Sequence, residues 1–194
     1  MQLEPRRRFL RTALAKACGL AAFAMGFSSA AEASVQEVSR MDLAGLINAL
    51  RSIGTPACLK AAESLTTKTG SAAGFDLHLR SAGLTQADAQ ILADALLATA
   101  AGAGPALRSF SASYNPDLGD AGAVVLAAAF PESMTELGLV GCLVGEGGGQ
   151  ALLAWAKTAP NLRMICVEDN RFSADLKAQF RALALEGRQI LVVV

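Results

Sequence analysis

Aromatic residues are scarce in this sequence. They account for 5 % of its 194 residues, although hydrophobic residues of all kinds account for 53 %. Most of the apolar material is therefore Ala, Leu and Val, and side chains of this size favour thin stacked layers over one bulky core. A chain of this length is expected to fold as a single domain.

A surplus of positive charge is also missing. The chain has 17 Lys and Arg against 17 Asp and Glu, and from residue 34 onward 15 acidic residues outnumber 12 basic ones. Domains that bind nucleic acid neutralise phosphates with clustered Lys and Arg. We therefore expect no nucleic-acid partner.

Residues that could ligate a metal ion are few. His78 is the only histidine, and the three cysteines beyond residue 33, which are Cys58, Cys142 and Cys166, share no C-x-x-C spacing. We expect neither a metal nor another cofactor. An odd number of cysteines also argues against the disulfide framework that many small secreted domains use.

Motifs for catalysis are equally weak. A Ser-His-Asp set can be drawn from Ser111, His78 and Asp76, but neither a strained nucleophile turn nor an oxyanion hole accompanies it. The glycine-rich run at residues 145–149 lacks the Lys-Ser/Thr that a phosphate-binding loop needs. We expect no catalytic residues and no enzymatic activity.

The N-terminal hydrophobic run is short. Residues 17–27 give 11 apolar or small residues, whereas a helix needs about 20 to span a bilayer. Arginines precede the run and Ala31-Glu32-Ala33 follows it, which is the layout of a secretory signal cleaved before Ser34. Residues 6–11, Arg-Arg-Arg-Phe-Leu-Arg, resemble the twin-arginine export signal R-R-x-F-L-K.

These features predict a twin-arginine-like signal peptide over residues 1–33. The mature protein is then exported to a periplasm or secreted, and it keeps no stable membrane anchor. The alternative is an organelle transit peptide, because such peptides are also rich in Arg and Ala and poor in acidic residues.

Four later segments share one pattern. Each starts with alternating apolar residues, continues with a polar or small residue, and ends with helical spacing. The segments begin at Phe75, Leu107, Met134 and Leu162. Their polar or small position falls at Ala82, Asn115, Cys142 and Asn170, at intervals of 33, 27 and 28 residues. Such intervals are typical of a strand-plus-helix repeat.

The second segment resembles the leucine-rich repeat of the ribonuclease-inhibitor type, with consensus L-x-x-L-x-L-x-x-N-x-I-G-D-x-G-A-x-x-L. The matching residues are Leu107, Phe110, Ala112, Asn115, Leu118, Gly119, Asp120, Gly122, Ala123 and Leu126. One extra residue separates Asn115 from Leu118. The resemblance implies an α/β fold over residues 75–194, a short solenoid of about four strand-helix repeats with a curved parallel sheet on the concave side and helices on the convex side.

Both ends of the repeat region carry further elements. Residues 34–74 contain an apolar stripe that predicts one helix, a second helix from Pro56, and a loop. We interpret them as a helical N-terminal cap, with a degenerate earlier repeat as the alternative. At the other end, the β-branched run 190–194 predicts one more strand at the open edge of the sheet.

Strand alternation predicts which side chains the concave face carries. The binding residues expected there form three rows across the strands, and the rows are Asp76, Ser109, Glu136 and Met164; His78, Ser111, Gly138 and Cys166; Arg80, Ser113, Val140 and Glu168. This surface is small, mixed and weakly acidic, without the aromatic and Arg anchors of a strong binding site. Asn115, Cys142 and Asn170 are expected to form a structural ladder that satisfies backbone groups of the turns.

The function that the resemblance implies is a non-catalytic module for protein-protein interaction, mainly monomeric. Two alternatives remain. Repeats of this type also occur in regulators of enzymes, namely ribonuclease inhibitors and GTPase-activating proteins of the Ran type. The chain could also be a repeat fragment without a dedicated partner.

Overall fold

The computed structural model describes residues 43–68, 74–100, 105–185 and 189–194. A helix over residues 43–53 is followed by eleven further elements, which are α2 (Pro56–Lys68), β1 (Phe75–His78), α3 (Gln86–Ala100), β2 (Leu107–Ser111), η1 (Pro116–Leu118), α4 (Gly119–Ala129), β3 (Glu136–Gly138), α5 (Glu146–Thr158), β4 (Met164–Cys166), α6 (Ala174–Leu183) and β5 (Leu191–Val193). The predicted signal peptide, residues 1–33, lies outside the described residues.

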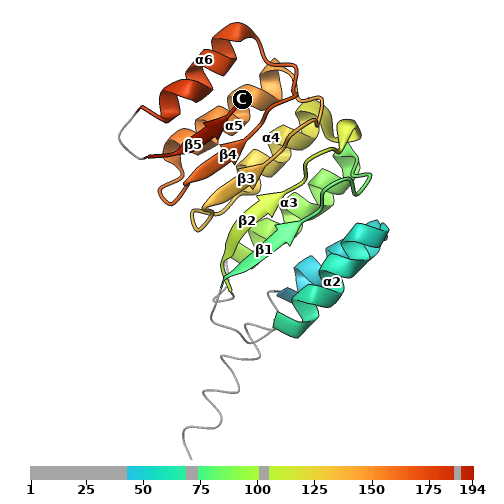
Figure 1. Cartoon of the computed structure of the whole chain (residues 1–194). Helices are drawn as coiled ribbons and strands as arrows, with labels where there is room; N and C mark the ends of the chain where they lie inside the picture. The colour runs from blue at the N-terminus through green and yellow to red at the C-terminus, as the bar shows by residue number, and fades with distance from the viewer. Residues whose placement is uncertain (1–42, 69–73, 101–104, 186–188) are drawn as a thin grey trace, which may run out of the picture.

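The five strands form one parallel sheet in the order β1-β2-β3-β4-β5 (Figure 1). Helices α3, α4 and α5 lie behind the sheet in this view, and α6 packs against α5 and β5. Four strand-helix units therefore stack in sequence order: β1–α3, β2–α4, β3–α5 and β4–α6, here called units one to four. The structure confirms the predicted α/β class, the parallel sheet and the additional strand β5.

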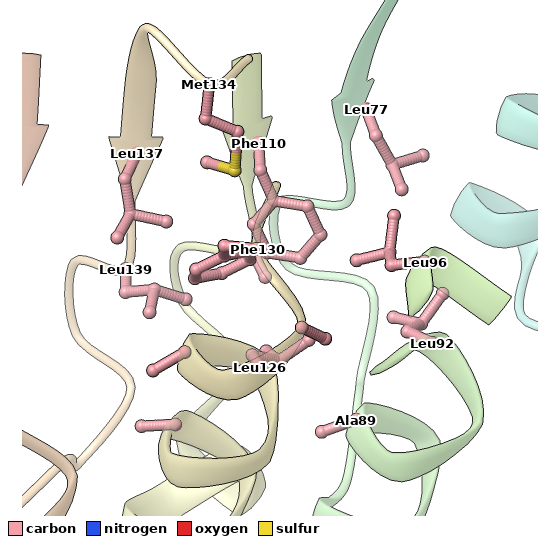
Figure 2. Packing of buried hydrophobic residues seen from close by; sticks show 14 of the residues in the cluster. Leu77, Ala89, Leu92, Leu96, Phe110, Leu126, Phe130, Met134, Leu137 and Leu139 are labelled. Atoms are coloured by element: carbon pink, nitrogen blue, oxygen red, sulfur yellow. The ribbon is translucent and has the colours of Figure 1, made fainter. Parts of the chain in front are cut away.

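The core lies between the sheet and the helices. In strand β1 the side chains of Phe75 and Leu77 are buried and those of Asp76 and His78 are exposed, as the alternating sequence predicts. Figure 2 shows the rings of Phe110 and Phe130 together at the centre of the packing, among the leucines of the neighbouring units. These two rings and that of Trp155 pack together where units two and three meet.

Asparagine side chains tie neighbouring units together at the turns. Asn115 is fully buried, and its Nδ2 donates to the backbone oxygens of Leu79 (2.9 Å) and Ala112 (2.7 Å) while its Oδ1 accepts from the N–H of Leu84 (2.9 Å). Asn170 makes the corresponding bonds between units three and four, at 2.7–3.1 Å, with the backbone of Leu139, Cys142, Val144 and Val167. Each amide satisfies backbone groups that the sheet leaves unpaired.

Cys142 takes the place of asparagine in unit three. Its Sγ donates to the backbone oxygen of Ala112 at 3.2 Å. A thiol has no carbonyl oxygen, however, and so it cannot replace the asparagine Oδ1 that accepts a backbone N–H of the preceding unit at the other turns. In unit two that amide, Leu118 N–H, donates instead to the backbone oxygen of Asn115 at 3.1 Å. The extra residue of this turn is thereby accommodated in the 3₁₀ turn η1.

Carboxylates connect the helices of successive units. Oδ1 of Asp120, in the first turn of α4, accepts from the N–H of Gly145 (2.8 Å) and Gly148 (2.7 Å) at the start of α5. Glu146 in turn accepts from the N–H and hydroxyl of Ser173 at the start of α6, both at 3.2 Å. Each carboxylate lies in the first turn of its own helix, and stacking also brings it to the positive end of the next helix.

Two helices stand at the β1 end of the sheet. The helix over residues 43–53 buries Leu43, Leu46 and Leu50, and α2 packs against β1 with Leu65 buried. They cover the apolar side of the first unit. In the other units the corresponding side is covered by the preceding unit of the stack. Within the part of the chain that the structure describes, no helix has the length and apolar character needed to cross a bilayer.

Candidate functional site

The open sheet face, which we define as the face opposite α3–α5, carries a hollow of about 430 Å³. Eleven of the twelve row residues line it, and these are His78, Arg80, Ser109, Ser111, Ser113, Glu136, Gly138, Val140, Met164, Cys166 and Glu168. Asp76 lies in a neighbouring hollow between α2 and β1, where Lys60 and Lys68 are also found. The predicted surface is therefore one continuous site over units one to four, except for its first acidic residue.

The strand register places the residues in rows. Asp76 pairs with Ser109, Ser109 with Glu136 and Glu136 with Met164. In the second row His78, Ser111, Gly138 and Cys166 follow one another in the same way. Strand β5 extends both rows with Leu191 and Val193, so the open face becomes more apolar toward β5.

Three of these side chains are more enclosed than expected. Ser109, Ser113 and Val140 were predicted to face solvent, but each is less than a tenth exposed. The hydroxyl of Ser113 accepts a hydrogen bond from the N–H of Val140 at 3.1 Å, which ties the two neighbouring turns together. Ser109, Ser113 and Val140 therefore form the base of the hollow, and their side chains do not protrude from it.

Tyr114 lines the hollow and is a candidate-site residue that sequence reasoning missed. It has a positive φ of 61°, and the residues at the same place in the other units do so too, with φ values of 50° for Ser81, 63° for Gly141 and 57° for Asp169. This left-handed residue turns the chain out of each strand just before the ladder position. The Tyr114 ring consequently lies across Gly141, at whose α-carbon a β-carbon would stand 3.2 Å from the ring.

Arg80 and Tyr114 form an anchor on the open face. The guanidinium carbon of Arg80 lies 4.1 Å from the centroid of the Tyr114 ring, and the ring is 41 % exposed. A guanidinium over an aromatic face is attracted by its quadrupole. The expectation that this surface lacks an aromatic and Arg anchor is therefore wrong.

Three polar side chains form a chain of hydrogen bonds across β1, β2 and β3. Ser109 Oγ donates to Glu136 Oε2 at 3.1 Å, and His78 Nε2 lies 3.3 Å from the same hydroxyl. A hydroxyl that donates its one proton to Glu136 can only accept from His78, so this arrangement requires the His78 tautomer with a proton on Nε2. In a catalytic triad the hydroxyl donates to the histidine, so this chain has the opposite polarity.

The set Ser111, His78 and Asp76 is not assembled into a triad. Ser111 Oγ lies 3.5 Å from Ser113 Oγ, and the carboxylate of Asp76 pairs with the guanidinium of Arg108 at 3.7 Å. Asp76 therefore does not orient His78. The hydroxyl of Ser111 is therefore not activated as a nucleophile by His78 and Asp76.

The thiols are held in their protonated form. Burial raises the pKa of Cys142 and that of Cys58, in both cases against hydrogen bonds that lower it. Burial also raises the pKa of Cys166, and the charges of Glu168 and Glu136 raise it further. Protonated thiols are poor nucleophiles and poor metal ligands. No group of three or more His, Cys, Asp or Glu suited to a metal ion occurs among the residues with described coordinates.

Glu168 carries an acceptor without a partner. Its Oε2 is buried and makes no hydrogen bond with the described part of the chain. Most buried acceptors in proteins are satisfied, so an exception calls for an explanation. Glu168 lines the hollow together with Glu136 and Cys166, and the carboxylate thus belongs to the candidate site.

Comparisons with known proteins add no functional assignment. No protein-family model matches the sequence, and no curated protein is significantly similar to it. The function is therefore argued from the open sheet face itself.

Proposed function

We propose that this chain is a non-catalytic leucine-rich-repeat module of the ribonuclease-inhibitor type that binds a protein partner through its open sheet face. In this proposal the sheet is the concave side of a short solenoid, residues 34–74 cap its first repeat, and the chain is mainly monomeric. The matches at Leu107, Asn115, Leu118 and Asp120 to the repeat consensus support the family assignment.

The observation that carries the binding proposal is the Arg80–Tyr114 anchor within a hollow built by four successive units. Tyr and Arg are enriched among the residues that dominate binding energy in protein interfaces. The polarity of the Ser109 hydrogen-bond chain and the protonated thiols favour binding over catalysis.

Site-specific photo-cross-linking tests the proposal in cells that produce the chain. A photoreactive amino acid at Ser111 on the open face is compared with one at Gln150, which is exposed on α5. We expect a discrete adduct at Ser111 alone, and we expect Tyr114→Ala to remove it. Adducts of equal yield at both positions, or an adduct insensitive to Tyr114→Ala, contradict the proposal.

We further propose that the chain is exported before it meets this partner. The arginines of residues 6–11 and the Ala31-Glu32-Ala33 sequence support this route. N-terminal sequencing of the protein recovered from its final compartment tests it, and the expected first residue is Ser34. Recovery of the intact Met1 end from that compartment overturns it.

A further inference from the structure

Charge on the open sheet face is divided between its two halves. Arg80 follows β1 and its guanidinium covers Tyr114, whereas Glu136 lies on β3 and Glu168 follows β4. Arg80 and Glu168 share a row but are three strands apart, which is about 14 Å at roughly 4.8 Å per strand. The cation is therefore too distant to neutralise the acidic half.

No ion pair involves Glu136 or Glu168 in the part of the chain that the structure describes. In the described ranges the ion pair is that of Asp76 with Arg108, next to α2 and away from Glu168. Glu136 receives the hydroxyl of Ser109, and Oε2 of Glu168 receives no hydrogen bond from any described residue. A carboxylate oxygen withdrawn from water without a partner costs free energy, which a cation placed beside the carboxylate would offset.

The carboxylates of Glu136 and Glu168 both lie near the thiol of Cys166. Both raise the pKa of the Cys166 thiol, after the larger effect of burial, so Cys166 lies within the field of Glu136 and of Glu168. The three residues line the same hollow as the apolar side chains of Val140 and Met164. A negative recess with an apolar border is thus present on the β3–β4 half.

We propose that the partner segment inserts a Lys or Arg side chain into this recess, so that its cation binds Glu168 and Glu136. This inference rests on the proposed function and specifies its partner chemistry. Lys and Arg have long aliphatic stems that bury along apolar surface while the charged end reaches a polar group. Val140 and Met164 provide that surface, and the carboxylates provide the acceptors.

A protein segment fits the site better than a free amine. The hollow extends from Arg80 and Tyr114 in the first two units to Glu168 in the fourth, so an occupant must be long enough to contact both halves. A segment with its cation in the acidic recess can at the same time place another side chain on the exposed Tyr114 ring. Charge complementarity then fixes the orientation of the segment.

Selection from a displayed library of random peptides tests the proposal on the full-length chain. Affinities of the enriched peptides are measured by fluorescence anisotropy for the parent, for Glu136→Gln/Glu168→Gln, and for Glu63→Gln/Glu132→Gln, which removes the same charge from two exposed sites away from the hollow. We expect a shared Lys or Arg in the enriched peptides. The Glu136→Gln/Glu168→Gln variant should bind these peptides about tenfold or more weakly than the parent, whereas the affinity of the control variant should stay within about twofold of the parent.

The outcomes separate the inference from the proposed function. The inference is overturned if the peptides require Tyr114 but bind the Glu136→Gln/Glu168→Gln variant with the same affinity as the parent. The open face then remains the binding site. A selection that yields no peptide sensitive to Tyr114→Ala or to the glutamate changes overturns both. Thermal melts of each variant establish that the fold is retained, and the affinity of the expected peptides should fall as salt is raised.

Discussion

The backbone N–H of Gly119 donates to the backbone oxygen of Cys142 at 3.2 Å, across the boundary between units two and three. At the other two turns an asparagine side chain, that of Asn115 or Asn170, joins the neighbouring units. The 3₁₀ turn η1 moves Leu118 N–H onto Asn115 and brings Gly119 N–H to the next unit. The extra residue in unit two therefore compensates for the cysteine in unit three, because the turn that it forms satisfies Leu118 N–H without an asparagine side chain.

We first predict that these two departures are energetically coupled. Cys142→Asn alone should lower the free energy of unfolding by about 1–3 kcal/mol, because Leu118 N–H already donates to the oxygen of Asn115 and is not available to the new Oδ1 at this fully buried position. Deletion of Pro116 alone should destabilise as well, since the thiol cannot accept Leu118 N–H. Urea denaturation of the double variant should show a loss smaller than the sum of the two by about 1–2 kcal/mol. Additive losses contradict the coupling.

The two asparagines of the ladder should differ in their contribution to stability. Asn115→Ala is expected to cost about 2–3 kcal/mol, because it removes the partner of Leu84 N–H and of Leu79 O and leaves Ala112 O with the weaker thiol donor of Cys142 alone. Asn170→Ala should cost less, about 1–2 kcal/mol, since the residue is partly exposed and water can reach the turn. Asn161→Ala is the control, because that exposed side chain makes one bond, to Glu132, and its melt should be almost unchanged.

Much of this architecture follows from sequence alone. The alternation Phe75, Leu77, Leu79 places one set of side chains in the core, and the 27- and 28-residue intervals bring equivalent strands into register. Interactions between units do not follow in the same way. The carboxylate of Asp120 reads as a cap for α4, and only the stacking of α4 on α5 shows that it binds Gly145 and Gly148.

The binding anchor was missed for a related reason. Tyr114 stands at a turn position directly before Asn115, and the row pattern takes every second residue and ends at Ser113 in this unit. Its equivalent in unit three is Gly141, and a glycine at this place is the signal for a left-handed backbone. Aligning Gly141 with Tyr114 could have placed the ring at the rim of the open face. The compensation between η1 and Cys142 has no such signal, because it depends on individual hydrogen bonds.

Adjacent glycines of α5 should respond in opposite directions to alanine. At Gly148 a β-carbon would stand 2.6 Å from Val144 Cγ1 and 2.8 Å from Asp120 Oδ1, whereas at Gly147 the nearest atom is 3.9 Å away. We expect Gly148→Ala to lower the free energy of unfolding by about 1–3 kcal/mol through overpacking and the displaced cap. Gly147→Ala should raise it by about 0.5 kcal/mol through helix propensity. Equal effects in chemical denaturation would show that α4 and α5 are not held this closely.

Glu168 should lower the stability of the free chain. Glu168→Gln removes a charge whose Oε2 is buried without a partner, and it relieves repulsion from Glu136. We expect a higher Tm for Glu168→Gln at neutral pH and no change for the exposed control Glu63→Gln. A lower Tm for Glu168→Gln would show that this carboxylate already has a partner in the free chain.

Strand β5 should protect the last unit of the sheet. Ile190 is buried, Val192 and Val194 pack on the core, and β5 pairs with β4 through Leu191, Val192 and Val193. Deleting residues 190–194 uncovers that apolar surface and the backbone groups of β4, and an uncovered strand edge pairs readily with other chains. We expect the truncated protein to aggregate and to melt at a lower temperature, whereas the full-length protein remains mainly monomeric in light scattering.

A point substitution distinguishes strand pairing from simple loss of surface. Leu191 is 59 % exposed on the open face, so Leu191→Ser should leave the pairing with β4 intact and keep the protein soluble. Ile190→Ser places a hydroxyl in the core and should cause part of the loss seen on truncation. If the truncated chain stays monomeric and equally heat-stable, β5 is not part of the cooperative unit. The exposed backbone of β4 is then tolerated in solution, and the apolar end of the open face has no role in stability.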